Sequence, residues 1–190
     1  MEGLTIKQNE IFAQRDKYFF YNNILESISN AKEEICILAR SGSTLTAFDE
    51  EIQEAINRNC QVRIILCARN QETINSMAFR GYNTTNHSAI ISEIDNSIRN
   101  LKSLKEKINK SQIYLLKIRE IKYLPPIGLS IADPESIDGK LFALLVSFRS
   151  QSRSGPSILL KKKNDIGLFN YFKKEFDNYW EAADEIIEFK

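Results

Sequence analysis

Side chains suited to acid–base or nucleophilic chemistry are scarce in this sequence of 190 residues. Its single histidine, His87, could act as a base or nucleophile near neutral pH. His87 follows an asparagine- and threonine-rich segment, so a surface position is the simpler interpretation. Asp133 precedes a proline between two apolar runs, where it could support a reacting group or only initiate a turn. His87 and Asp133 are therefore weak catalytic candidates.

The three cysteines form no recognisable metal or redox motif. Cys36, Cys60 and Cys67 include no Cys-x-x-Cys pair, and Cys36 and Cys67 lie inside apolar runs. A free cysteine in such a run behaves as a small buried hydrophobic residue. We interpret all three as structural thiols of a reducing compartment. With one histidine in the chain, we expect neither a metal site nor a cofactor.

Two loops carry groups that could bind an anion. The first, Arg40-Ser41-Gly42-Ser43-Thr44, separates an apolar strand from a helix, so its hydroxyls and amides could hold a phosphate. The acidic residues 49–51 in the first turn of that helix oppose this reading, because they already complement the helix dipole. An ordinary loop is the alternative.

The second loop, residues 149–155, places two arginines among serines and a glycine, although it could also be a solvated turn. Ser130, Asp133 and Asp138 could line a floor between the two loops. The candidate ligand-binding residues are Arg40, Ser41, Ser43, Thr44, Ser130, Asp133, Arg149, Ser150 and Arg153.

The elements that must position these residues follow a strand–helix pattern. Residues 34–40 and 61–68 are short, continuously apolar runs, typical of strands buried on both faces of a parallel sheet. Helices are expected over 11–31, after the first loop, near 73–79, from Ser88 onward and over 165–189; further strands are expected over 113–121, 127–132, 141–148 and 158–161. This order predicts an α/β fold in a single domain, residues 1–190, with a mixed β-sheet flanked by helices; residues 1–10 could be flexible.

The overall charge is balanced. Lys and Arg number 26 and Asp and Glu 25, so the chain lacks the global cationic excess that favours non-specific nucleic-acid binding. Local basic runs at 102–122 and 161–163 could contact nucleic acid, or could complement a helix dipole and protect a sheet edge. The N-terminal segment lacks a signal peptide's apolar region, and no apolar run approaches the ~18 residues of a membrane span. A cytoplasmic location is expected.

Three stretches of the chain are similar to those of a known fold. The first is the strand ICILAR with the loop SGSTL, a helix and the strand VRIILC; the second is the strand pair around Asp133; the third is the ending LFNYFKKEFDNYWEAA. Together they resemble one half of the phospholipase D-like fold. The likeness covers residues 20–185 and implies a phospholipase D-like α/β half.

Active members of that family carry the pattern HxKxxxxD, whose His attacks phosphorus while the Lys holds the phosphoryl oxygens. If Asp133 matches the Asp, Pro126 stands at the His position and Gly128 at the Lys position. Proline offers no nucleophile and glycine no cation. The family's downstream Gly-Ser-x-Asn segment is also missing. The resemblance therefore implies a degenerate member without the catalytic motif, more consistent with a pseudoenzyme than with an enzyme.

Three functions stay open. The favoured hypothesis is a non-catalytic, bacterial-type binding or interaction module that senses a nucleotide or phosphorylated ligand, or acts as a regulatory subunit, as a homodimer or with a partner protein. The first alternative is a phosphodiesterase or nuclease with a rearranged active site that uses His87 or Asp133. The second is a nucleic-acid-binding accessory protein that acts through local basic loops.

Overall fold

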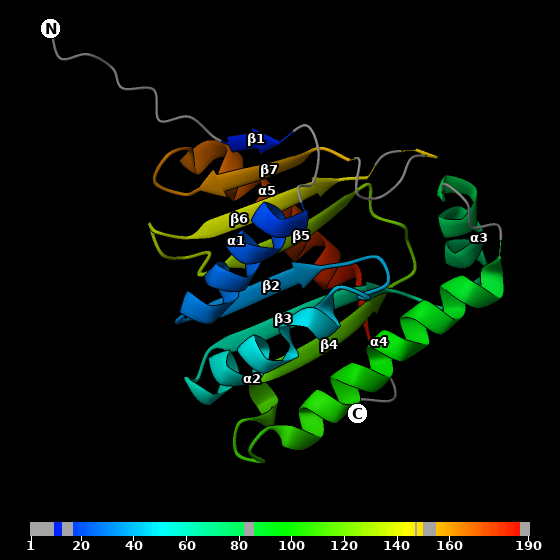
Figure 1. Ribbon diagram of the computed structural model, residues 1–190, viewed down its shortest axis with the longest axis horizontal. Coiled ribbons are helices and arrows are strands. Elements are labelled where there is room, and N and C mark those ends of the chain that lie inside the picture. The colour runs from blue at the N-terminus through cyan, green and yellow to red at the C-terminus, as the bar shows by residue number, and fades with distance from the viewer. Residues whose placement is uncertain (1–9, 13–16, 82–85, 147, 150–154, 187–190) are drawn as a thin grey trace, which may run out of the picture.

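The computed structural model describes residues 10–12, 17–81, 86–146, 148–149 and 155–186. Within them, eight strands form one sheet in the order β1-β7-β6-β5-β2-β3-β4-β8 (Figure 1). The strands are β1 (Glu10–Phe12), β2 (Glu34–Leu38), β3 (Gln61–Cys67), β4 (Leu116–Ile121), β5 (Ile127–Ala132), β6 (Lys140–Leu145), β7 (Ser157–Lys161) and β8 (Asp184–Glu185). The helices are α1 (Lys17–Asn30), α2 (Asp49–Asn57), α3 (Gln71–Arg80), α4 (His87–Lys107) and α5 (Ile166–Ala182), with 3₁₀ turns η1 (Leu45–Phe48) and η2 (Ile113–Leu115).

The sheet is mixed, which confirms the α/β fold predicted from the sequence. β2, β3 and β4 are parallel neighbours, and β5, β6 and β7 continue from β2 as antiparallel strands. The central strands are buried on both faces because their side chains are apolar at consecutive positions: Ile64, Ile65 and Leu66 of β3 are each fully buried.

Helices cover both faces of the sheet (Figure 1). The first face packs against α1, α2 and α4 through isoleucines and leucines such as Ile28, Ile56 and Ile94. The second face packs against α5 through Phe169, Phe176 and Trp180. Phe169 and Phe176 are seven residues apart, so two turns of one helix place them on the same face.

Several element boundaries differ from the sequence-based expectations. The helix expected over 11–31 begins at Lys17, and residues 10–12 instead form β1, which pairs with β7 at the sheet edge. The last helix ends at Ala182, and the chain continues into β8 rather than remaining helical to residue 189. The helix expected from Ser88 onward begins at His87, after Asn86, whose side chain caps α4 by accepting hydrogen bonds from the N–H groups of residues 88 and 89. Of the segment expected to be flexible, residues 1–9 lie outside the described residues.

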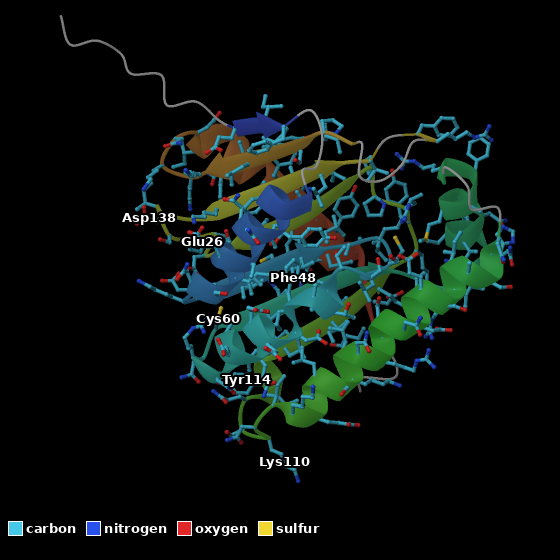
Figure 2. All side chains as sticks on the ribbon, viewed as in Figure 1. Glu26, Phe48, Cys60, Lys110, Tyr114 and Asp138 are labelled. Carbon is cyan, nitrogen blue, oxygen red and sulfur yellow. The ribbon has the colours of Figure 1, made fainter. Side chains whose placement is uncertain are left out.

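The cysteines are free and buried, as predicted for structural thiols. Burial raises the pKa of both Cys60 (Figure 2) and Cys67 to about 12, and burial also raises the pKa of Cys36. These thiols stay protonated near neutral pH and are therefore poor nucleophiles.

Candidate functional site

The carboxyl ends of the parallel strands β2, β3 and β4 meet at one edge of the sheet, which we call the carboxyl edge. β5 and β6 also reach it: Leu129 near the start of β5 pairs with Leu38, and Leu145 at the end of β6 pairs with Ile127. Ligands of open α/β sheets usually bind at such an edge. Both loops predicted to hold an anion begin here.

The loop after β2 is fastened to α4 through a hydroxyl. Ser41 is buried, and its Oγ donates a 2.8 Å hydrogen bond to Oε1 of Glu93. A carboxylate thus already uses the hydroxyl that a bound phosphate would need, and it adds a like charge. Of the other predicted residues, Arg40 is half-buried, and Ser43 and Thr44 are exposed.

Arg149, after β6, bridges to the end of α3. Its guanidinium carbon lies 5.1 Å from the ring centre of Phe79 and 5.3 Å from that of Phe148. Its backbone N–H donates to the carbonyl of Arg80, and Arg80 Nη2 donates to the carbonyl of Val146. The fold therefore brings together two arginines, of which Arg80 was not singled out from the sequence.

The remaining predicted residues do not join this edge as one site. Ser130 lies in the middle of β5, opposite Ile37, and is 9% exposed. His87 is the exposed first residue of α4. Ser150 and Arg153 lie outside the described residues.

Asp133 lies at the opposite edge, beside the start of β2. Its carboxylate accepts hydrogen bonds from the backbone N–H groups of Lys32, Glu33 and Glu34, at 2.7–3.2 Å. Asp138 is at this same edge, just before the start of β6 (Figure 2). The length of β5 separates Asp133 from the loops of Arg40 and Arg149, so the three cannot form one site as the sequence analysis expected. The geometry assigns Asp133 to closing the turn between α1 and β2.

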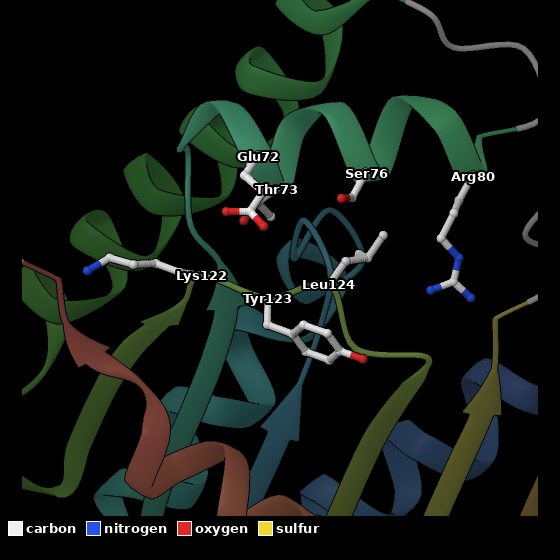
Figure 3. A pocket seen from close by; sticks show the side chains of 7 residues that line it. All are labelled: Glu72, Thr73, Ser76, Arg80, Lys122, Tyr123 and Leu124. Carbon is white, nitrogen blue, oxygen red and sulfur yellow. The ribbon is translucent and has the colours of Figure 1, made fainter.

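A hollow at the carboxyl edge lies between α3 and the segment that joins β4 to β5 (Figure 3). We call it the α3 pocket; its volume is about 240 Å³. It is lined by Glu72, Thr73, Ser76, Arg80, Lys122, Tyr123 and Leu124. In Figure 3 the α3 side chains and the Tyr123 ring face each other across the hollow, with Glu72 at one end and Arg80 at the other.

Thr73 is the least satisfied polar residue of the α3 pocket. It is 1% exposed, and its Oγ1 is buried without a hydrogen-bond partner. Its backbone N–H, in contrast, donates to the side chain of Asn70, the N-cap of α3. A buried hydroxyl without a partner costs free energy, so this position is stabilised by any group that hydrogen-bonds to it.

The opposite wall of the α3 pocket is held by α5 and β8. The Tyr123 ring is 57% exposed and stacks on Tyr179, with ring centres 6.3 Å apart and planes 15° apart. Lys122 Nζ lies 2.7 Å from Asp184, whose carboxylate raises the pKa of the lysine. Lys122 is thus already paired with a carboxylate.

One wall of the α3 pocket could have been predicted from the spacing of polar residues in the sequence. Residues 72, 76 and 80 are polar at intervals of four, which places them along one face of a helix. The sequence predicted only a short helix near 73–79 in a stretch of mixed polarity, and the wall opposite comes from residues about fifty positions later.

In the described part of the chain, no three His, Cys, Asp or Glu residues gather closely enough to hold a metal ion. None of the described helices combines the length and the apolar character that crossing a membrane requires.

No protein-family model matches the chain, and no curated protein matches it. Solved structures do match. Nuc from Salmonella typhimurium, a phospholipase D family member, aligns with a TM-score of 0.52 at 13% identity, over 94% of this chain and 99% of Nuc. Phosphatidylserine synthase from Haemophilus influenzae aligns with a TM-score of 0.63 at 10% identity, over 94% of this chain and 39% of the synthase. The chain has a phospholipase D-like fold.

A third solved structure that matches the chain is that of a DNA-binding protein. TrmBL2, an archaeal chromatin protein that binds DNA, aligns with a TM-score of 0.57 at 16% identity over 97% of this chain. The alignment covers 56% of TrmBL2, so this chain spans little more than half of that protein's length.

Pro126 and Gly128, which the resemblance sets against the family's His and Lys if Asp133 is its Asp, lie at the carboxyl edge. Pro126 precedes β5, and its carbonyl accepts a hydrogen bond from Val146. Gly128 is packed closely: a Cβ built there would lie 3.3 Å from Cδ1 of Leu144 and 3.5 Å from the carbonyl oxygen of Leu38. Neither residue supplies a nucleophile or a cation.

The basic run 161–163 ends β7 at the edge opposite Arg149, so it does not adjoin the carboxyl edge. Each of its lysines has an acceptor. Lys161 pairs with Glu10, Lys163 pairs with Asp138, and Lys162 Nζ donates to the carbonyl of Pro134. β7 lies between β1 and β6 and is not the edge strand, so edge protection does not account for this run. The pairing of its lysines weakens the case for nucleic-acid binding.

Proposed function

We propose that this chain is a non-catalytic binding module that holds a small phosphorylated ligand at the carboxyl edge of the sheet. The observation that carries the proposal is the pair Pro126 and Gly128, which stand where the resemblance expects a nucleophile and a phosphate-binding lysine. A Cβ at Gly128 would lie 3.3 Å from Cδ1 of Leu144, so a side chain there requires Leu144 to shift.

Cations at the same edge support binding without catalysis. Arg80 and Arg149 are held in place by backbone contacts, so their guanidinium groups are partly ordered before a ligand arrives. Arginine suits phosphate because its planar fork can donate two parallel hydrogen bonds. Such a module would serve as the sensing part of a regulator, alone, as a homodimer or with a partner protein.

Two assays on folded protein test this function. In the first, purified protein is incubated with a generic activated phosphodiester, alongside His87→Ala, an exposed position whose replacement leaves the fold intact. We expect no turnover by the wild type, and turnover abolished by this substitution would establish an enzyme instead. In the second, the melting temperature is followed with nucleotides, sugar phosphates and inorganic phosphate. A rise with at least one phosphorylated compound is expected, and no rise with any of them would contradict the proposal.

The likeness to a DNA-binding chromatin protein favours nucleic acid as the second candidate ligand. The run 161–163 is already paired, which weakens that candidate. Titration of labelled single- and double-stranded DNA at several salt concentrations decides between the two. Tight binding whose affinity falls steeply with salt would favour nucleic acid.

A further inference from the structure

We propose that the α3 pocket binds a nucleoside monophosphate whose base carries an amino group. This inference rests on the proposed function and deepens it by naming the site and the ligand class. The base would stack on Tyr123, its amino group would donate to Glu72, and its phosphate would bind Arg80. Thr73 and Ser76 would supply hydroxyls along the α3 wall.

The size and walls of the pocket suit a single nucleotide. A volume of about 240 Å³ lies just below the range of ~300–1,000 Å³ typical of drug-sized ligands. One wall is the exposed ring of Tyr123, already held by its stacking on Tyr179. An ordered aromatic ring stacks on bases with little entropy cost. Leu124, 7% exposed, adds apolar surface beneath.

The opposite charges at the two ends of the pocket determine the orientation of the bound nucleotide. Glu72 and Arg80 lie on the same face of α3, eight residues apart, which corresponds to ~12 Å along a helix axis. A phosphate next to Glu72 would be repelled, so it belongs at the Arg80 end. A carboxylate at the other end accepts hydrogen bonds from an amino group such as that of adenine or cytosine. Arg80 has five N–H donors, and its single bond to the Val146 carbonyl is compatible with phosphate binding.

Thr73 provides the independent sign of a ligand. Thr73 lines the pocket, and its hydroxyl oxygen is buried without a hydrogen-bond partner. A valine of nearly the same shape would remove that unsatisfied group, so threonine here costs the unliganded chain free energy. A ligand whose sugar or base reaches this hydroxyl gives the threonine a partner.

Calorimetric titration of the full chain tests the site with AMP, adenosine, ribose 5-phosphate and IMP as probes. AMP should bind at least about tenfold more tightly than adenosine, which lacks the phosphate, and than ribose 5-phosphate, which lacks the base. AMP should also bind more tightly than IMP, in which an oxygen replaces the amino group. Ribose 5-phosphate or IMP binding as tightly as AMP would overturn the proposed base contacts.

Matched substitutions locate the binding. Tyr123→Leu and Arg80→Gln should each weaken AMP binding about tenfold or more, whereas Tyr114→Leu and Arg99→Gln, exposed and outside the pocket, should leave it unchanged. Thr73→Val should weaken AMP binding while leaving the melting temperature of the ligand-free protein unchanged or higher. That combination separates a ligand contact from loss of folding.

The outcomes distinguish this inference from the function on which it rests. If phosphorylated compounds bind but the pocket substitutions change nothing, the inference is wrong and the binding module stands. If none of the phosphorylated compounds binds folded protein, both are wrong. If AMP binds with the expected dependence on Tyr123, Arg80 and Thr73, both are supported.

Discussion

The Asp133 carboxylate accepts a 2.7 Å hydrogen bond from the backbone N–H of Glu33, a residue one hundred positions earlier in the chain. The N–H groups of Lys32 and Glu34 donate to the same carboxylate, so one side chain holds the backbone at the start of β2. Asp133 itself has a φ of +49°, a left-handed conformation that aspartate tolerates better than most residues. The residue that the sequence offered as a weak catalytic candidate thus closes a turn.

Replacing Asp133 should therefore damage folding. Asp133→Ala leaves three N–H groups without their acceptor, of which that of Glu34 is partly buried, and we expect it to lower the free energy of unfolding by about 1–3 kcal/mol. Urea denaturation measures this change. Asp138→Ala, at an exposed residue paired with Lys163, is the matched control and should leave the midpoint nearly unchanged. Equal midpoints for the two variants would contradict the assignment.

Arg63 should be the strongest polar anchor between the sheet and α5. It is 13% exposed, its Nε lies 2.6 Å from Glu34, and its guanidinium carbon lies 5.0 Å from the Phe176 ring centre. Arg63→Met leaves the Glu34 carboxylate half-buried without its cation, at an expected cost of about 2–4 kcal/mol in unfolding free energy.

Chemical denaturation of Arg63→Met should be compared with that of Lys122→Met, which breaks the exposed pair with Asp184. The lysine variant should unfold at nearly the wild-type midpoint, because exposed ion pairs contribute little. If Arg63→Met also unfolds there, Arg63 does not anchor α5.

Gly42 should be intolerant of any side chain. Its φ is +76°, and a Cβ built there would lie 2.8 Å from Cδ2 of Leu66, closer than carbon atoms approach without a shift. Gly42→Ala should lower the melting temperature, by strain of about 1–3 kcal/mol. Gly167 in α5 is the control: the nearest atom to its Cβ would be 3.7 Å away, and Gly167→Ala should be neutral or stabilising. Calorimetry of both variants checks the contrast.

Stability should fall in alkaline solution because of the buried thiols. The ordinary thiol pKa of 9.0 is raised by burial to about 12 for Cys60 and Cys67, so between pH 9 and 12 the unfolded chain releases protons that the folded chain retains. The buried thiols contribute fully to the free energy of unfolding below pH 9, and this contribution is lost as the pH rises from 9 to 12. Denaturation midpoints should show this loss, and Cys60→Ala/Cys67→Ala should reduce it.

The same burial predicts slow thiol chemistry. A disulfide reagent at pH 8 should leave Cys36, Cys60 and Cys67 largely unmodified in native protein and modify all three in urea, because each thiol is both buried and protonated. Rapid modification of the native protein would show that at least one cysteine is accessible.

Much of the fold follows from local pattern. The consecutive apolar residues of β2 and β3 predict strands buried on both faces, and the helix between them requires those strands to be parallel. The spacing of Ile90, Ile94 and Ile98 likewise predicts α4. These signals act over a few residues, so the sequence alone was sufficient for the α/β class and the mixed sheet.

Only the tertiary structure decided where the functional groups lie. β1 is three residues long and exists because β7 supplies its hydrogen bonds, which no local pattern in residues 10–12 reveals. Asp133 and Arg40 were expected at one site, but the antiparallel pairing of β5 with β2 sends them to opposite edges. The α3 pocket needs Thr73 and Tyr123 from separate segments. Packing between distant parts of the chain determines strand direction and register. It therefore also determines which residues come together at a site.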